Sequence, residues 1–256
     1  MGGLVDKVAI VTGAGTGIGR ATAVRFAAEG ARVVAMGRTE ATLEQTRELA
    51  MSRGGEVIGV TEDAGSEEGA ERAVLAALDA FGGVDILVNN AGVGWAYEQV
   101  KPGSMAPLAD TPSELWRDVM RINLDSVYYM CHRAIPEMRK RGGGAIVNVA
   151  STGGLRGMGD AHAYSAAKAG MVNLTRSLAR TYGVENIRSN CLAPGLTDTA
   201  MVASRMAGAT EQALRQTIPL GRAGSPEEMA AAIVFLVTEA TYCNGAILVA
   251  DGGSSA

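Results

Sequence analysis

Cysteine and histidine are scarce in this sequence, with three cysteines and two histidines among 256 residues. The cysteines, Cys131, Cys191 and Cys243, are far apart and odd in number, so their spacing matches neither a disulfide framework nor a metal site. We interpret them as apolar side chains of the core, with a reactive thiol as the alternative. We therefore expect no metal ion.

Concentrated charge and long apolar runs are missing as well. The 23 basic and 27 acidic residues are spread along the chain and give a formal net charge of −4, which argues against a nucleic-acid partner. The first residues, MGGLVDKVAIV, have no signal-peptide pattern, and Asp6 stands where N-myristoylation requires serine or threonine. These absences favour a cytoplasmic protein with no membrane partner.

Short β-branched runs alternate with helical stretches along the whole chain. Most of the runs are almost continuously apolar, which is typical of strands covered on both faces. The alternation predicts right-handed βαβ units and an α/β fold, a doubly wound (Rossmann-type) parallel sheet of seven strands with helices on both faces. The expected strands are residues 7–12, 31–36, 55–60, 85–90, 144–150, 187–193 and 246–251. The expected helices are residues 17–29, 40–53, 66–81, 113–141, 162–182 and 226–238.

No linker or shift in composition divides the chain, so we expect residues 1–256 to form a single domain. Two connections are long, and both leave from the carboxyl ends of expected strands. Open parallel sheets bind ligands at these ends, and long loops in compact domains are usually functional. We predict a substrate loop near residues 93–112 and a lid near residues 194–225.

A glycine-rich turn, TGAGTGIG at residues 12–19, joins the first strand to the first helix. Glycines let backbone amides approach a pyrophosphate, and a helix N-terminus favours its negative charge. The spacing departs from G-x-G-x-x-G because Ile18 takes the place of the third glycine, and a tight turn without a ligand is the alternative. We expect the turn to bind a dinucleotide through Gly13, Gly15, Thr16, Gly17, Ile18 and Gly19.

The end of the second strand bears on the choice of cofactor. An acidic residue here would bind a ribose 2′-hydroxyl and select NAD, but Gly37 stands in its place and Arg38 follows. A guanidinium suits a 2′-phosphate. We expect NADP(H) in preference to NAD(H), the alternative for Arg38 being a solvated charge at a strand end.

Three residues form a candidate reaction site. Ser151 ends the fifth expected strand, and Tyr164 and Lys168 lie four residues apart in HAYSAAKAG. On a helix this spacing puts both side chains on one face, about 6 Å apart along the axis. An ammonium about 4 Å from the phenolate would lower the pKa of the phenol by about three units, towards neutral pH. The small residues between them would let a substrate approach, so we interpret Tyr164 as a general acid and base.

Together these motifs resemble the short-chain dehydrogenase/reductase family, in its single-domain branch, over essentially the whole chain. The resemblance rests on residues in seven places: Thr12-Gly13-x-x-x-Gly17-x-Gly19, Asn89-Asn90-Ala91-Gly92, Asn123 in RINLDS, Ser151, Tyr164, Lys168, and APGLTDT at 193–199.

The resemblance implies a role for each catalytic residue. Tyr164 would exchange a proton with the substrate oxygen, and Ser151 would hydrogen-bond that oxygen. Lys168 would bind the nicotinamide ribose and lower the pKa of the tyrosine. Asn123 would hold a water in a proton relay, with a helix cap or kink as the alternative.

The resemblance also implies further cofactor contacts. Asp63 would lie near the adenine, unless it only serves the turn after its strand. The segment after Pro194 would meet the nicotinamide carboxamide, with Thr197 standing where relatives often have an aliphatic residue. Together with Tyr164 and Lys168, the implied contacts are Asp63, Asn90, Ala91, Gly92, Pro194, Gly195, Thr197 and Thr199.

The expected substrate region is apolar with few polar groups, as small-molecule sites usually are. Trp95, Tyr97 and Met105 lie in the first long connection, and Met158, Met201 and Met206 lie near the other strand ends. His162 reaches the substrate in one interpretation and is an exposed residue at a helix start in the other. The candidate substrate contacts are Trp95, Ser151, Met158, His162 and Met201.

The sequence thus predicts an NADP(H)-linked oxidoreductase that interconverts a ketone and a secondary alcohol, acting on a small-molecule substrate. An NAD-linked alcohol dehydrogenase and a catalytically silent dinucleotide-binding protein are the alternatives.

Assembly is the last expectation. The expected helices 113–141 and 162–182 are apolar on more than one side, which calls for a second partner. By resemblance this partner is a second subunit, with the strand AILVAD (246–251) completing a homotetramer; a homodimer is the alternative.

Overall fold

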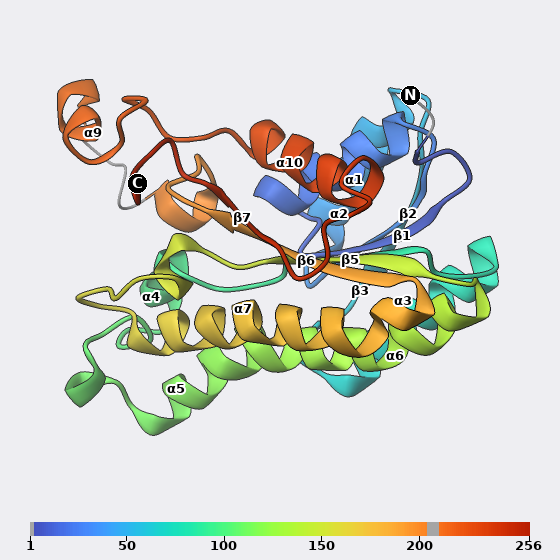
Figure 1. The fold of residues 1–256 in the computed structure, drawn as a ribbon. Helices are drawn as coiled ribbons and strands as arrows, with labels where there is room; N and C mark the ends of the chain where they lie inside the picture. Colours follow the sequence, from blue (N-terminus) through green and yellow to red (C-terminus); the bar gives the residue numbers. More distant parts are fainter. Residues whose placement is uncertain (1–2, 204–209) are drawn as a thin grey trace.

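A seven-stranded parallel sheet forms the centre of the computed structural model, which describes residues 3–203 and 210–256 (Figure 1). The strand order is β3-β2-β1-β4-β5-β6-β7. The strands are β1 (Val8–Thr12), β2 (Arg32–Gly37), β3 (Glu56–Thr61), β4 (Ile86–Asn89), β5 (Gly144–Val149), β6 (Ile187–Pro194) and β7 (Ile247–Ala250). The predicted fold class is confirmed, and each expected strand lies within two residues of the observed one.

The order of the strands reverses between β1 and β4, which creates the crevice where such sheets bind ligands. Val11 is paired with Val88 in the register of these two strands. Just beyond them the Thr12 hydroxyl accepts hydrogen bonds from the backbone amides of Asn90 (3.0 Å) and Ala91 (2.9 Å). The ends of β1 and β4 are therefore tied together at the crevice.

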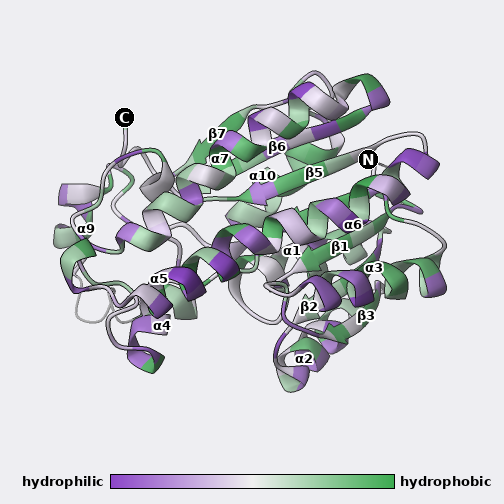
Figure 2. Cartoon of the chain, turned by 90° about the horizontal axis from the view of Figure 1, so that it is seen from below, coloured by the Kyte–Doolittle hydropathy of each residue, from purple (hydrophilic) through white to green (hydrophobic). Residues whose placement is uncertain are grey.

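Helices cover both faces of the sheet, in two layers that Figure 1 shows above and below it. One layer holds α1 (Gly17–Ala28), α2 (Glu40–Met51) and α10 (Pro226–Thr238). The other holds α3 (Glu67–Phe81), α6 (Ser126–Lys140) and α7 (His162–Tyr182). In Figure 2 the strands are mostly green, while the helices alternate green and purple, because only one side of each helix enters the core.

The expected helix 113–141 is wrong in one respect, because it is not continuous. It consists of α5 (Ser113–Met120), a π-helical turn (Arg121–Asp125) and α6. The Asn123 side chain enters this turn, where its Nδ2 donates to the carbonyl of Val119 at 3.0 Å. The amide thus takes over a backbone acceptor where the helix widens, and such turns are frequent at functional sites.

The apolar residues that predicted an interface on α6 and α7 are mostly used inside the subunit. Two of them, Leu174 and Leu178, are half-buried, and Tyr128 is 56% exposed. The sheet and the neighbouring helices already cover the remaining five: Val127, Met130, Ile135, Met171 and Val172. Of these residues only Tyr128, Leu174 and Leu178 are left for contact with a second subunit, and the assembly stays a prediction. Cys131 and Cys191 are buried as expected, while Cys243 is half-buried.

The two long connections contain short elements. The first holds α4 (Trp95–Val100) and a 3₁₀ turn at Leu108–Asp110; the second holds a 3₁₀ turn at Ala200–Val202 and α9 (Glu211–Thr217). Figure 1 shows α4, α5 and α9 gathered at one end of the molecule. In the part of the chain that the structure describes, no helix combines the length and apolar character needed to span a bilayer.

Candidate active site

Two cavities adjoin each other at the carboxyl end of the sheet. One, of about 280 Å³, extends from the glycine-rich turn to the ends of β2 and β3. The other, of about 420 Å³, lies against Ser151, Tyr164 and Lys168. Both are lined by Ile18, Asn90, Gly92, Thr199 and Met201. A single extended ligand can therefore reach from the glycine-rich turn to the three candidate catalytic residues.

The glycine-rich turn has the close backbone packing that a pyrophosphate cradle needs. Gly13 and Gly17 have positive φ angles of 64° and 52°, which glycine adopts without strain. A Cβ on Gly19 would lie 2.3 Å from the carbonyl oxygen of Gly13, and one on Gly15 would lie 2.4 Å from Thr42 Oγ1. With the N-terminus of α1 directly behind the turn, these residues fit the phosphates of a dinucleotide.

Arg38 and Asp63 both line the smaller cavity, at its far end. Arg38 is exposed there, and no carboxylate at Gly37 opposes an anion. Asp63 serves its turn as well, because its Oδ1 accepts from the amide of Gly65 at 2.9 Å. Burial raises the pKa of Asp63, but hydrogen bonds from Arg121 and Gly65 and the charges of Arg121 and Arg38 outweigh this and leave it lowered.

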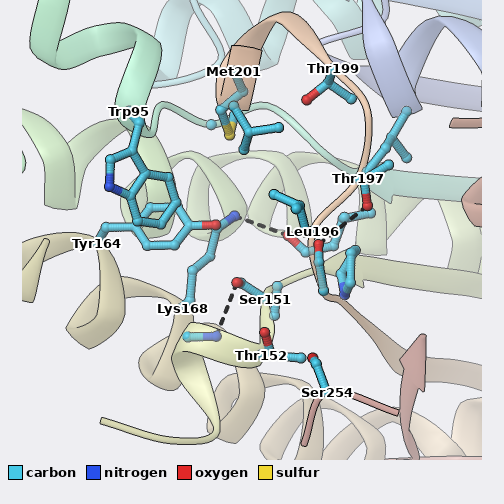
Figure 3. Close-up of a pocket in the computed structure, with 18 of the residues that line it drawn as sticks. Trp95, Ser151, Thr152, Tyr164, Lys168, Leu196, Thr197, Thr199, Met201 and Ser254 are labelled. Carbon is cyan, nitrogen blue, oxygen red and sulfur yellow. Dashed lines mark hydrogen bonds between the residues drawn. The ribbon is translucent and has the colours of Figure 1, made fainter. Parts of the chain in front are cut away.

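Ser151, Tyr164 and Lys168 meet in the larger cavity (Figure 3). Ser151 follows β5, and its Oγ accepts from the amide of Gly153 at 3.0 Å. Tyr164 and Lys168 lie one turn apart on α7 and are 5% and 4% exposed. Lys168 Nζ donates to the carbonyl of Val149 at 3.0 Å and lies 5.7 Å from the centre of the Tyr164 ring.

The expected shift of the tyrosine pKa has the opposite direction in the structure. Burial raises the pKa of the Tyr164 phenol, and a hydrogen bond with Ser151 only partly opposes this. Burial also lowers the pKa of Lys168 to about 8, a shift that the nearby Cys191 thiol opposes. The expectation assumed an ammonium about 4 Å from the phenolate and left out the cost of burial. In the structure both groups are buried, and Nζ is directed to the carbonyl of Val149.

Asn123 lies beside Lys168 across the backbone of Gly92. A Cβ on Gly92 would lie 2.7 Å from Asn123 Oδ1 and 3.4 Å from Lys168 Nζ. Asn123 Oδ1 accepts from the amide of Val93 at 3.2 Å. This fully buried side chain thus lies both in the π-helical turn and beside Lys168. Its part in a proton relay stays a prediction.

The remaining cofactor candidates line at least one of the two cavities, except Gly19, which lines neither. Asn90 Nδ2 donates to the carbonyl of Thr12 at 2.9 Å. Thr197 is buried, and its Oγ1 donates to the carbonyl of Gly195 at 3.3 Å. The other predicted cofactor contacts that line at least one of the two cavities are Gly13, Gly15, Thr16, Gly17, Ile18, Arg38, Asp63, Ala91, Gly92, Pro194, Gly195 and Thr199.

Four of the five substrate candidates line the larger cavity: Trp95, Ser151, Met158 and Met201. The Trp95 ring packs against Tyr164 with their centres 5.5 Å apart. Figure 3 shows Trp95 and Met201 above Tyr164, on the side opposite Thr152 and Ser254. Met201, in the second long connection, packs against Gly94 in the first. A Cβ on Gly94 would lie 2.9 Å from the Met201 sulfur.

Two other expectations for the substrate region are wrong. His162 lines neither cavity in the described part of the chain, and its Nδ1 accepts from the amide of Leu108 at 2.9 Å. It therefore anchors the loop at 93–112. Met105 is 4% exposed and packs with Val119 and Ile122 instead of facing a ligand. Met206 lies outside the described residues.

Two arginines at the site were not predicted from the sequence. Arg156 lines the larger cavity. Arg121 pairs with Asp63, 2.8 Å away, and with Asp118, 3.1 Å away. The sequence offers little signal for either, because an isolated arginine is usually a solvated surface charge. Arg156 lies five residues after Ser151, in the same loop at the end of β5. This short distance from Ser151 was the one feature of the sequence that could have placed Arg156 at the site.

Comparisons with known proteins find similar proteins over almost the whole chain. Residues 13–255 match the family described as Enoyl-(Acyl carrier protein) reductase. The chain is 41% identical over 253 residues to cis-4-hydroxycyclohexanecarboxylate dehydrogenase from Sinomonas cyclohexanicum, covering 98% of this chain and 97% of that protein. It is 37% identical to 2-(R)-hydroxypropyl-CoM dehydrogenase from Xanthobacter autotrophicus, covering 98% and 100%.

A solved structure agrees with these relatives. The crystal structure of levodione reductase superposes with a TM-score of 0.91 at 35% identity, and the match covers 98% of each chain. The fold is thus shared with a solved structure over almost the whole length of both chains. The chain belongs to the short-chain dehydrogenase/reductase family and is an oxidoreductase that works with a nicotinamide dinucleotide.

Proposed function

We propose that this enzyme interconverts a ketone and a secondary alcohol with NADP(H), with Tyr164 as the general acid and base. The observation that carries the proposal is the position of Ser151 and Tyr164 in a cavity that adjoins the glycine-rich turn. When bound, the nicotinamide supplies or accepts the hydride. The protein's own contribution is to hold the substrate oxygen and to move its proton.

The substrate oxygen would lie between Ser151 Oγ and the Tyr164 hydroxyl. Because burial raises the pKa of Tyr164, the phenol keeps its proton at neutral pH and is ready to donate it during carbonyl reduction. The Lys168 ammonium stabilises the phenolate that this transfer leaves. We propose that a water between Asn123 Oδ1 and Lys168 Nζ, which flank Gly92, returns a proton to the site.

The preference for NADP(H) rests on Arg38 and on the missing carboxylate at Gly37. Asp63 would approach the adenine, while the turn from Gly13 to Gly19 would hold the phosphates. Residues 93–112 would serve as the substrate loop and residues 194–225 as the lid, because Trp95 and Met201 reach the cavity from them. The name of the Sinomonas relative supports a cyclic alcohol or ketone as substrate.

A ketone panel tests the proposal. Purified enzyme would be mixed with NADPH and with cyclic and linear ketones, and the absorbance of the reduced nicotinamide followed. Turnover of at least one ketone, faster with NADPH than with NADH, is the expected result. A protein that binds the dinucleotide but oxidises it with no ketone, and reduces it with no alcohol, would be a silent binder and would contradict the proposal.

A further inference from the structure

Arg156 lines the larger cavity and has no acidic partner among the described residues. The described residues that line the larger cavity include no aspartate or glutamate, and their charged members are Arg156 and Lys168. Lys168 is buried and directed to Val149. Several arginines elsewhere do pair with acids, as Arg139 does with Glu185 and Arg222 with Glu228.

The local structure holds Arg156 at the edge of the cavity. The 3₁₀ turn Thr152–Gly154 follows Ser151, and the Arg156 amide donates to the carbonyl of Thr152 at 3.2 Å. The guanidinium Nη1 donates to the carbonyl of Ser254 at 3.0 Å, and Ser254 lines the same cavity. Figure 3 shows Thr152 and Ser254 next to each other, on the far side of Ser151 from Trp95.

That contact uses one of the five N–H donors of a guanidinium. The described structure gives the side chain no other hydrogen bond or ion pair. Two aspartates near the cavity have partners already: Asp251 accepts from Ser254 Oγ at 3.0 Å, and Asp160 accepts from Trp95 Nε1 at 3.4 Å. Arg156 is exposed at the edge of this cavity, so its remaining donors are open to solvent and to a ligand in the cavity. The other described residues that line the cavity are apolar or neutral, apart from Lys168.

We propose that Arg156 binds a carboxylate on the substrate, at a position several bonds from the carbonyl that reacts. The inference rests on the proposed function, since Ser151 and Tyr164 fix the reacting end, and it names the substrate class as monoanionic oxo acids and hydroxy acids. The planar guanidinium matches a carboxylate in a two-point contact. Trp95, Met158 and Met201 would pack against the carbon skeleton between the two ends.

The test separates this inference from the proposed activity by measuring binding without reaction. Titration calorimetry on the enzyme with bound NADP⁺ would compare cyclohexanecarboxylate with cyclohexanecarboxamide and pentanoate with pentanamide. These probes have no carbonyl to reduce and no alcohol to oxidise. We expect at least one acid to bind the parent enzyme about tenfold to a hundredfold more tightly than its amide.

Variants at Arg156 identify the group responsible. Arg156→Met removes the charge and the bond to Ser254, whereas Arg156→Gln removes the charge but keeps a donor for the Ser254 carbonyl. We expect both to lose the preference for the acid and Arg156→Lys to keep part of it. Arg53→Met, at an exposed arginine beyond α2, is the matched control and should keep the full preference.

Turnover provides a second readout. The ratio of kcat/KM for 4-oxocyclohexanecarboxylate to that for its carboxamide should fall about tenfold or more in both Arg156→Met and Arg156→Gln. Equal binding of acid and amide by the parent, or no binding of any probe, would overturn the inference. A preference that survives in Arg156→Gln would do so too, because Arg156 would then only hold Ser254. Reduction of neutral ketones alone would leave the proposed function standing while the inference fails.

Discussion

The Arg121 guanidinium lies 2.8 Å from the carboxylate of Asp63 and 3.1 Å from that of Asp118. Asp118 in turn accepts a hydrogen bond from the Tyr97 hydroxyl. A chain of polar contacts thus runs from the expected adenine end of the cofactor cavity to α4 in the loop at 93–112. Burial, together with Asp118, raises the pKa of Tyr97 to about 12, so this phenol remains a donor throughout the usable pH range.

Arg121→Met should therefore weaken cofactor and substrate together, raising both KM values several-fold. The cost in folding stability should be only about 1 kcal/mol, because the paired side chains are 37% and 35% exposed and water screens them. Steady-state kinetics and urea unfolding provide the two readouts. Arg133→Met, which breaks a surface pair with Glu67, should leave both KM values unchanged.

A double-mutant cycle tests whether Tyr97 and Arg121 act through the same chain of contacts. Tyr97→Phe should raise the KM for substrate in the parent but have little further effect in Arg121→Met, because the chain is already broken. Additive effects of the two substitutions would show that the two ends act independently.

Cofactor choice should depend on Gly37 and Arg38. We expect the parent enzyme to bind NADPH about tenfold to a hundredfold more tightly than NADH, as a charge-assisted bond to the 2′-phosphate predicts. Arg38→Ala should remove most of this preference. Gly37→Asp should reverse it; a Cβ there would lie 3.3 Å from Leu43 Cδ2, so the leucine side chain must shift by a few tenths of an ångström. Fluorescence titration with the two reduced cofactors measures the ratio; similar affinities in the parent would refute the assignment.

The Tyr164 hydroxyl should be essential for turnover and dispensable for cofactor binding. Tyr164→Phe removes only the hydroxyl and keeps the ring contact with Trp95. We expect kcat to fall by at least about a hundredfold, with the affinity for NADPH unchanged within about threefold. Stopped-flow and equilibrium titration provide the two values, and a variant with near-normal kcat would eliminate Tyr164 as the proton donor.

Lys168 should make the stability of the cofactor-free enzyme depend on pH. Its pKa is about 8 in the folded protein against 10.5 for the free side chain, so the unfolded chain binds more protons between these values. Folding stability should then rise with pH across this window, by up to about 3 kcal/mol. Comparing the parent with Lys168→Met at pH 7 and pH 10 isolates the effect, which should favour the parent at the higher pH.

Lys140→Met, at an exposed lysine paired with Glu137, is the control and should show no such trend. A difference between the parent and Lys168→Met that stays constant with pH would mean that Lys168 titrates normally.

Assembly is expected to use β7 and α10. β7 is an edge strand, and Val249 on it is 40% exposed. Phe235 on α10 is 43% exposed, and Tyr242, which follows α10, is fully exposed. Light scattering at micromolar concentration should give the mass of a homotetramer or homodimer, and Val249→Lys should reduce it. A monodisperse, active species of 26.3 kDa would contradict the expected assembly.

The strands were predictable because their apolar runs are nearly continuous and are bounded by glycine or charge, as at Ala31–Met36. The candidate catalytic residues were predictable because their spacing is fixed by one strand end and one helical turn. The direction of the Lys168 ammonium was not, since it depends on the carbonyl of Val149, a backbone group nineteen positions away in the chain. The π-helical turn at Arg121–Asp125 leaves no mark in residue propensities, because a side-chain amide from Asn123 stabilises it.

Glu98 gives the loop at 93–112 an internal closure. Its carboxylate accepts from the amides of Gly103 and Met105, at 2.7 and 2.6 Å, and from the hydroxyl of Ser104 at 3.2 Å. Most of the turn from α4 to Met105 is thus organised by a residue of its own. The segment that brings Trp95 to the cavity therefore keeps its own shape, and Tyr97 and Met105 only have to fasten it to α5 and the turn that follows.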